Sequence, residues 1–358
     1  MALQSESYDI RDAIRTVVEG NELTLEQSTA AMDAIMSGEV AGSQIAALVT
    51  ALRMKGETVS EIAGFARAMR DHSLRVDADS VDVPLLDTCG TGGDHSNSFN
   101  ISTTATFAIA AAGIRIAKHG NRAASSLCGS ADLLEGLGVQ VELTADEVST
   151  CIDQVGIGFM YAPAFHPAMR FVGPVRREIG IRTVFNVLGP LTNPAGACHQ
   201  LIGVGHPGIA RKLAEVLAML GSTRAVLVHS DEGLDEIGVE GGTAVTEWNR
   251  TTAEVREYSI SPEEFGLKRG CADDLRGGGV SENVAITRSI LKGESGPRRS
   301  VTLMNAGAGI YAAEGAPSIA DGIAMAAAAI DSGRALSKME QLVAITNRLV
   351  AERKEVAE

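Results

Sequence analysis

A glycine-rich segment, Gly90-Thr-Gly-Gly-Asp94, follows an apolar run at residues 83–86 and has the composition of an anion-binding loop. Glycine adopts positive φ and lets the backbone approach a ligand closely, so successive amides can point at a phosphate. The spacing matches neither the dinucleotide-binding pattern nor the P-loop pattern, and both assignments therefore fail. An ordinary tight turn between a strand and a helix is the alternative interpretation.

A second candidate anion site, Asn100-Ile-Ser-Thr103, is preceded by Ser98 and opens an apolar helical stretch at 105–113. Ser, Thr and Asn at a helix start satisfy some free amides and leave others for a phosphate. Taken alone, residues of these types are more often plain helix caps. Two such loops close together in the sequence favour a ligand with more than one phosphate.

A third polar segment, Lys118-His-Gly-Asn-Arg122, follows the apolar run at 114–117, and Ser126 and Ser130 lie just beyond it. Open parallel sheets bind ligands at the carboxyl ends of their strands, which favours phosphate contacts for these cations and hydroxyls. His119 is as consistent with a structural histidine as with a general base.

An acidic pair, Asp235 and Glu236, follows the apolar run at 225–229 and is the candidate metal site. Adjacent carboxylates suit magnesium, which one or two acids hold together with substrate oxygens. A solvated acidic turn is the alternative. A proline-punctuated segment at 165–190 adds candidate guanidinium groups for a substrate carboxylate, which they can bind in a bidentate manner. These are Arg170, Arg176, Arg177 and Arg182.

The elements that must position these residues fall into two groups. The first 75 residues contain only helical patterns, with capping boxes at Thr24 and Thr58. From residue 83 onward short apolar runs alternate with helical stretches, which predicts a mostly parallel central sheet flanked by helices. Predicted strands include 83–86, 114–117, 139–143, 157–161, 201–204, 225–229 and 301–304, and a hairpin is predicted from 244–248 and 253–260.

The predicted fold class is therefore α/β, with a small all-helical N-terminal domain and a large α/β domain. We expect the small domain at residues 1–76, joined by the inserted segment at about 165–190, which could pack back on it and act as a hinge. We expect the large domain at residues 77–164 and 191–358.

Composition limits the possible partners. Lys plus Arg total 31 and Asp plus Glu total 45 among 358 residues, a net charge of −14, and aromatic residues make up 4%. Both values disfavour binding to nucleic acid or an anionic membrane. The five cysteines are far apart and never spaced Cys-x-x-Cys, which disfavours a disulfide framework or a zinc site. With no signal-peptide pattern and no apolar run of bilayer length, we expect a cytoplasmic protein.

The sequence as a whole resembles the anthranilate phosphoribosyltransferases of the tryptophan pathway, from the helical start to Asn305-Ala-Gly-Ala308 and the last helix. Seven motifs in order carry the resemblance: Gly90-Thr-Gly-Gly-Asp94, Asn100-Ile-Ser-Thr103, Lys118-His-Gly-Asn-Arg122, His166-Pro-Ala-Met-Arg170, Val175-Arg-Arg-Glu-Ile-Gly-Ile-Arg-Thr183, Asn186-Val-Leu-Gly-Pro-Leu-Thr-Asn-Pro194 and Leu234-Asp-Glu236.

The resemblance implies a homodimer that forms through the helical domain, with the active site in the cleft facing the large, phosphoribosyl pyrophosphate-binding domain. It implies transfer of the phosphoribosyl group of phosphoribosyl pyrophosphate to the amine of anthranilate, giving N-(5-phosphoribosyl)anthranilate and pyrophosphate. Phosphoribosyl pyrophosphate would contact Gly90, Gly93, Asp94, Ser98, Asn100, Ile101, Ser102, Thr103, Lys118, Asn121, Ser126 and Ser130. Anthranilate would contact Gly90, His119, Asn121, Ala162, Pro163 and Arg176. Magnesium, two ions per subunit, would be bound by Ser102, Asp235 and Glu236.

The chemistry implied by the resemblance needs neither a covalent nor an acid–base catalytic residue. Departure of pyrophosphate gives an oxocarbenium-like transition state, and metal ions and preorganised amides stabilise the charge on the leaving group. The aromatic amine is already neutral at pH 7, so positioning the two substrates in line should supply much of the remaining rate.

One segment departs from the family pattern. Relatives tend to carry an Asp after the glycines of Gly277-Gly-Gly-Val-Ser-Glu-Asn283, and we interpret the difference as structural drift that leaves the function unchanged. Two other functions stay open. A pyrimidine nucleoside phosphorylase would need a different lysine–serine phosphate loop and would not use the acidic pair. A non-catalytic nucleic-acid-binding paralogue should be basic and lack the metal carboxylates.

Overall fold

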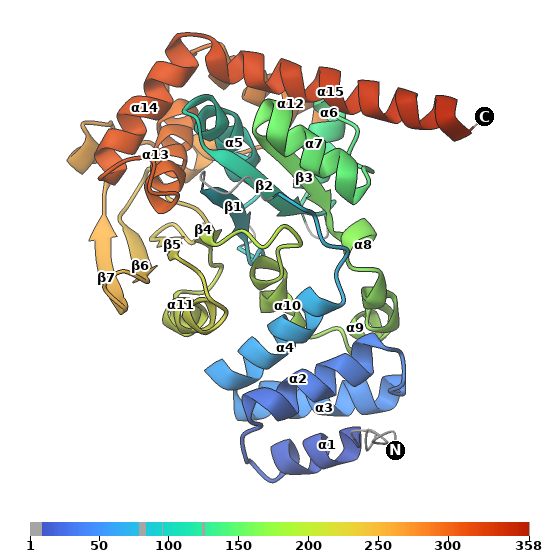
Figure 1. Ribbon diagram of the computed structural model, residues 1–358. Coiled ribbons are helices and arrows are strands. Elements are labelled where there is room, and N and C mark those ends of the chain that lie inside the picture. Colours follow the sequence, from blue (N-terminus) through green and yellow to red (C-terminus); the bar gives the residue numbers. More distant parts are fainter. Residues whose placement is uncertain (1–8, 79–83, 95, 124–125, 358) are drawn as a thin grey trace.

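The computed structural model describes residues 9–78, 84–94, 96–123 and 126–357. An N-terminal helical unit lies at one end of the molecule, and the C-terminal helices α14 (Ile319–Asp331) and α15 (Arg334–Ala357) lie at the other (Figure 1). The helices of this unit are α1 (Ile10–Val18), α2 (Leu25–Met36), α3 (Gly42–Lys55) and α4 (Val59–Asp71). Both predicted capping boxes are present, because Thr24 and Thr58 each accept a hydrogen bond from the amide three residues on.

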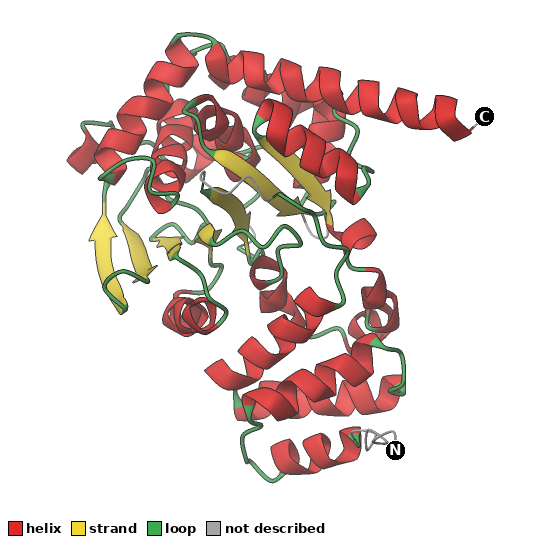
Figure 2. Cartoon of the chain, viewed as in Figure 1, coloured by secondary structure: helices red, strands yellow, loops and turns green. Residues whose placement is uncertain are grey.

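The described residues after the helical unit form one sheet between two helical layers (Figure 2). Its strand order is β3-β2-β1-β4-β5-β6-β7. The β5–β6 and β6–β7 pairs are antiparallel, and the other pairs are parallel. The strands are β1 (Leu85–Gly90), β2 (Arg115–Gly120), β3 (Ile157–Tyr161), β4 (His199–Gly203), β5 (Arg224–Ser230), β6 (Thr243–Asn249) and β7 (Glu254–Ile260). The predicted α/β class and the hairpin are confirmed, and residue 83 of the first predicted strand lies outside the described residues.

Helices cover both faces of the sheet. They are α5 (Ile101–Ala111), α6 (Ser130–Leu137), α7 (Ala145–Val155), α11 (Ala210–Met219), α12 (Val280–Leu291), α13 (Pro297–Ala312), α14 (Ile319–Asp331) and α15 (Arg334–Ala357). Successive strand residues point to opposite faces. Val226 and Val228 accordingly join the core beneath α5 and α13, whereas Ala225 and Leu227 join a core formed with α11 and the helical unit. The helical unit therefore shares a core with one face of the sheet, and the other face has a core of its own.

Two predicted strands are wrong. Residues 301–304 lie inside α13, which is buried on nearly every side, and a short apolar run does not distinguish a buried helix from a strand. Residues 139–143 alternate between buried and exposed but pair with no described strand. The Gln140 amide instead donates to Thr346 Oγ1 of α15 at 3.1 Å, so a helix takes the place of a neighbouring strand.

The proline-punctuated segment packs on the helical unit. It forms α8 (Ala162–Phe165), a short 3₁₀ turn, α9 (Gly173–Ile179) and α10 (Phe185–Leu188). Val172, Val175, Phe185 and Leu188 belong to the same core as α1–α4. Figure 1 shows α9 and α10 between the helical unit and the sheet. The segment therefore connects the two parts of the molecule next to the strand ends.

The order of the strands creates a crevice at the end of β1. The chain passes from β1 to β2 and β3 on one side, and then crosses from β3 to β4 on the other side of β1. In open parallel sheets, ligands bind at such a switch point, outside the carboxyl ends of the strands. The glycine-rich segment lies at this end of β1.

Candidate active site

The glycine-rich segment turns sharply at the carboxyl end of β1. Gly92 and Gly93 have φ values of +64° and +80°, which L-residues with side chains rarely adopt. A Cβ on Gly90 would lie 2.5 Å from Asp235 Oδ2, and one on Gly93 would lie 1.7 Å from Arg182 Nη1. The Gly92 amide donates to Asp235 Oδ2 at 2.8 Å. The backbone conformation therefore favours glycine at 92 and 93, and the residues of the turn line the crevice.

The second polar segment is the N-terminus of α5. The Ser102 amide donates to Glu236 Oε1 at 3.1 Å, so the acidic pair contacts both loops through backbone amides. Asn100 is the N-cap residue, but its Nδ2 donates to the Cys128 carbonyl at 2.9 Å and forms no cap to the amides of α5. The start of this long helix therefore keeps donors that a phosphate can use.

Lys118 is buried beneath these loops. Its Nζ donates to the Thr88 carbonyl and lies 3.4 Å from Ser102 Oγ. Burial lowers the pKa of Lys118, while Asp87 and Glu236 nearby oppose that shift. The ammonium group thus contacts the base of the α5 loop from within the fold.

The acidic pair lies in an environment that disfavours two negative charges. Burial is the main cause of the raised pKa of Asp235, and Glu236 and Asp94 add to it. Burial also raises the pKa of Glu236 to about 7, although Lys118 and the Ser102 amide oppose the shift. Burial and mutual repulsion destabilise the ionised forms of these two carboxyl groups, and a bound cation would stabilise them.

The oxygens at this position fit magnesium. Asp235, Glu236 and the Ser102 hydroxyl are hard oxygen donors, the kind of ligand that magnesium prefers. Within residues 9–78, 84–94, 96–123 and 126–357, no three His, Cys, Asp or Glu side chains are grouped as a ready-made metal site. An ion here would therefore need further oxygens from substrate or water, as is usual for magnesium at phosphate sites.

Ten of the twelve residues predicted for phosphoribosyl pyrophosphate line one cavity of about 650 Å³. They are Gly90, Gly93, Asp94, Ser98, Asn100, Ile101, Ser102, Thr103, Ser126 and Ser130. Asp235 and Glu236 line it as well. Of the remaining two predicted residues, Lys118 lies beneath the cavity and Asn121 lines a neighbouring one.

The neighbouring cavity, about 630 Å³, is more apolar and contains five of the six residues predicted for anthranilate. These are His119, Asn121, Ala162, Pro163 and Arg176. The sixth, Gly90, lines the first cavity. Arg176, Phe185 and Gly189 line both cavities, so the two are adjacent and meet at the inserted segment.

Arg176 differs from the other arginines of the inserted segment. Its guanidinium is half-buried, lies 5.9 Å from the Phe185 ring centre, and forms no hydrogen bond or ion pair with any described residue. Burial lowers the pKa of Arg176. Arg170 and Arg177 are exposed, and Arg170 stacks on Phe171 at 4.6 Å. Among the four arginines of the inserted segment, Arg176 is the one that lines both cavities, and its guanidinium has donors available for a ligand.

Two histidines form part of the apolar cavity. The rings of His119 and His166 lie 5.0 Å apart, and neither Nε2 has a hydrogen-bond partner among the described residues. Burial lowers the pKa of His119 to about 3 and the pKa of His166 to about 4. Both imidazoles are therefore neutral at pH 7, and His119 is poorly suited to hold a proton there.

Sequence reasoning missed a buried pair that holds these loops together. Asn193 Nδ2 donates to Asp87 Oδ2 at 2.7 Å and to the Ala117 carbonyl at 2.8 Å. Asp87 Oδ1 accepts from the His119 amide at 3.2 Å. Asp87 lies just before the glycine-rich segment, and Asn193 lies in the Asn186–Pro194 motif. Their positions in these motifs were the signal in the sequence that could have identified the pair. Arg182, not selected from among its neighbours, donates to the Gly92 carbonyl at 3.4 Å.

Comparison with known families gives two matches that together cover most of the chain. The glycosyl transferase family α/β domain matches residues 82–336, and the helical bundle domain of the same family matches residues 11–73.

Individual relatives cover nearly the full length. The chain is 53% identical over 339 residues to the anthranilate phosphoribosyltransferase of Chloroflexus aurantiacus, covering 94% of this chain and 99% of that one. The crystal structure of the Thermus thermophilus anthranilate phosphoribosyltransferase has a TM-score of 0.89 at 45% identity, covering 94% and 99% of the two chains. The Saccharomyces cerevisiae anthranilate phosphoribosyltransferase in complex with phosphoribosyl pyrophosphate and magnesium has a TM-score of 0.85 at 28% identity, covering 95% and 98%. A further structure of the yeast protein contains 4-fluoroanthranilate.

Proposed function

The chain belongs to the anthranilate phosphoribosyltransferases of the glycosyl transferase family, and from this premise we propose which residues of the two adjacent cavities bind its substrates. Its function is phosphoribosyl transfer to anthranilate in tryptophan biosynthesis, as the resemblance implied. The observation that carries the proposal is that a polar, amide-lined cavity and an apolar cavity meet at one unpaired guanidinium.

Phosphoribosyl pyrophosphate is the occupant of the polar cavity. The amides of the glycine turn and of α5, with Ser126 and Ser130, provide donors for phosphate oxygens from three separate loops. Lys118 contributes its charge from beneath and fixes the Ser102 hydroxyl. Asn121 lines the adjacent apolar cavity. The loops are held by the sheet, so these donors are positioned before the substrate arrives.

Magnesium, two ions in each subunit, is the proposed metal. Asp235, Glu236 and the Ser102 hydroxyl hold it, and when bound it neutralises the charge of the pyrophosphate leaving group. The chain would supply the remaining stabilisation through the Gly92 and Ser102 amides, which donate to Asp235 and Glu236 in the structure and would be free for that group once a cation binds the two carboxylates. No step requires a proton acceptor from the protein before the bond to the amine forms.

Anthranilate is the occupant of the apolar cavity. Its ring contacts Ala162 and Pro163, and its carboxylate binds Arg176, where the cavity meets the glycine turn at Gly90. The neutral His119 and the Asn121 amide present polar atoms without adding charge beside the amine. This arrangement directs the amine at the polar cavity, and the gain in rate comes from holding the two substrates in line.

Three further assignments belong to the same proposal. The protein is a homodimer that forms through the helical domain, where Val18 and Met54 are exposed apolar side chains. It is cytoplasmic and has neither nucleic acid nor a membrane as a partner. Among the described helices none is long and apolar enough to cross a bilayer. The small domain comprises residues 1–76 and is joined by the segment at 165–190. The large domain comprises residues 77–164 and 191–358. Residues 1–8 and 79–83 lie outside the described part of the chain.

The relatives favour this function over the two alternatives. A nucleoside phosphorylase and a non-catalytic nucleic-acid binder have no use for the Asp235–Glu236 pair, and the net charge of −14 opposes the second. The test mixes the protein with anthranilate, phosphoribosyl pyrophosphate and magnesium and follows the loss of anthranilate fluorescence. Loss of fluorescence that requires all three components is expected. A folded protein that leaves the fluorescence constant would refute the assignment.

A further inference from the structure

A side chain outside both cavities holds the N-terminus of α5 in place. Asn283 is the fourth residue of α12 and is almost fully buried. Its Nδ2 donates to Asn100 Oδ1 at 2.9 Å, and its Oδ1 accepts from the Gly278 amide at 2.9 Å. The side-chain amide of Asn283 therefore links two loops, the one before α5 through its nitrogen and the one before α12 through its oxygen.

The contact decides what the Asn100 side chain does. An Asn at an N-cap position usually accepts a hydrogen bond from an amide of the first helical turn. Here Asn283 supplies the donor to Asn100 Oδ1, and the Cys128 carbonyl accepts from Asn100 Nδ2 at 2.9 Å. The side chain is fixed away from the α5 amides, which leaves those amides to other acceptors such as Glu236.

The loop that Asn283 also contacts lies against the same segment. The Phe99 amide donates to the Leu275 carbonyl at 2.9 Å, and the Gly277 amide donates to the Asn97 carbonyl at 2.9 Å. A Cβ on Gly277 would lie 2.6 Å from Asn283 Oδ1, so close approach requires glycine there.

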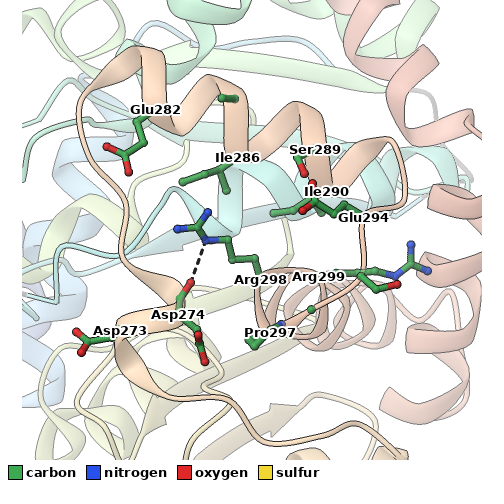
Figure 3. Close-up of a pocket in the computed structure, with 13 residues that line it drawn as sticks. Asp273, Asp274, Glu282, Ile286, Ser289, Ile290, Glu294, Pro297, Arg298 and Arg299 are labelled. Carbon is green, nitrogen blue, oxygen red and sulfur yellow. Dashed lines mark hydrogen bonds between the residues drawn. The ribbon is translucent and has the colours of Figure 1, made fainter.

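The other side of this loop is fixed by α13. Figure 3 shows Arg298 pointing at the main chain of Asp274, and its Nε donates to that carbonyl at 2.9 Å. Its Nη2 donates to the Arg276 carbonyl at 2.9 Å. The 275–278 segment is thus held between α13 and the loop that precedes α5.

We propose that Asn283 is a positioning residue for the phosphoribosyl pyrophosphate site, acting through Asn100. The inference rests on the proposed function, in which Asn100 and the amides of α5 contact that substrate. Asn283 fixes the orientation of the Asn100 amide before the substrate binds, so less ordering is needed on binding. Asn283 is not among the described residues that line either cavity.

The chain offers a matched control one helical turn away. Thr287 Oγ1 and Thr104 Oγ1 form a hydrogen bond of 2.9 Å between the same two helices, α12 and α5. Both threonines are buried, and neither lines the polar cavity. Thr287→Val therefore removes a comparable buried contact without acting on Asn100.

The experiment measures steady-state kinetics of Asn283→Asp, Asn283→Ala and Thr287→Val in the full-length protein. Asp keeps the shape of Asn and accepts from the Gly278 amide but has no hydrogen to donate to Asn100, so it remains informative if the Ala variant does not fold. Loss of this hydrogen bond should raise the KM for phosphoribosyl pyrophosphate about tenfold. The KM for anthranilate should change little. Thr287→Val should lower the unfolding temperature and leave both KM values unchanged.

A double mutant separates the inference from the proposed function. In an Asn100→Ala background, Asn283→Asp should produce no further rise in the KM for phosphoribosyl pyrophosphate. Additive effects, or an Asn283→Asp protein with the KM values of the wild type, would overturn the positioning role. If Asn100→Ala alone leaves that KM unchanged, both the Asn100 assignment and the inference are wrong. Absence of transferase activity in the wild type would instead contradict the proposed function.

Discussion

Replacing Arg176 by Ala tests the assignment of the apolar cavity most directly. The guanidinium is half-buried, stacks near Phe185 and has no hydrogen bond or ion pair with another described residue. Its removal therefore breaks no polar contact within the described part of the fold. We expect the unfolding temperature to stay the same or rise slightly, because burying an unpaired charge opposes folding.

The effect on anthranilate should be large by comparison. A hydrogen bond between a guanidinium and a carboxylate contributes roughly 1.5–3 kcal/mol, so its loss should weaken anthranilate use about ten- to over a hundredfold. The KM for phosphoribosyl pyrophosphate should stay within about twofold, since most of its proposed contacts lie on other loops. Arg176→Lys keeps the charge but loses the planar pair of donors, and we expect only partial recovery.

The assay is the initial rate of anthranilate fluorescence loss, measured against each substrate in turn. Arg250→Ala is the control, because Arg250 is an exposed arginine that follows β6 and lines neither cavity. Its kinetic constants should match those of the wild type. Wild-type values of both kcat and KM for anthranilate in Arg176→Ala would refute the reasoning and make Arg177 or Arg170 the next candidate.

Three other perturbations have defined outcomes. The double change Asp235→Asn with Glu236→Gln should lower activity by orders of magnitude, with partial recovery at high magnesium, because magnesium prefers ionised carboxylates to amides; superimposable magnesium titrations of the two proteins would contradict the metal assignment. Gly92→Val should abolish binding of phosphoribosyl pyrophosphate in a folded protein, since the φ of +64° disfavours a β-branched residue; unchanged affinity by calorimetry would argue against an anion-binding turn. His166 is buried and neutral with a pKa of about 4 against 6.5 unfolded, so the unfolded state binds more protons between these values and stability falls as the pH drops through that window. His166→Gln should make the unfolding free energy less dependent on pH in this window, by up to about 1.4 kcal/mol per pH unit. The measurement is denaturant unfolding of both proteins at pH 7 and pH 5. An equal loss of unfolding free energy in the two proteins between these pH values would exclude this cause.

Local features of the sequence predicted much of the fold. The capping boxes at Thr24 and Thr58 depend on residues three apart, and each is present as expected. The glycine turn was identifiable because its conformation restricts the residue type at each position. Residues 139–143 and 301–304 were mistaken for strands because a pattern of apolar residues does not specify which element will cover them.

The contacts that orient the site were not accessible in the same way. Asn283 and Asn100 are 183 positions apart, and Asn193 and Asp87 are 106 apart. Such pairs are set by how strands and helices assemble, and nothing in the residues themselves specifies the partner. Gly279, the last glycine of the 277–283 segment, caps α12 without a side-chain hydrogen bond, and a Cβ there would meet nothing within 4 Å. Nothing steric in the structure requires the glycine at this position.

The two carboxylates of the polar cavity affect how a phosphate ligand and a cation would bind there together. Asp235 and Glu236 accept hydrogen bonds from the Gly92 and Ser102 amides, which are donors that a phosphate would also use. A phosphate at either amide competes with a carboxylate for the same hydrogen, and the two anions repel each other. Lys118 is already bonded to Thr88 and is too deeply buried to neutralise both acids and the ligand. The carboxylates leave the amides at low cost only when a cation becomes their partner. Phosphoribosyl pyrophosphate and a divalent cation therefore fit this site together better than either fits alone.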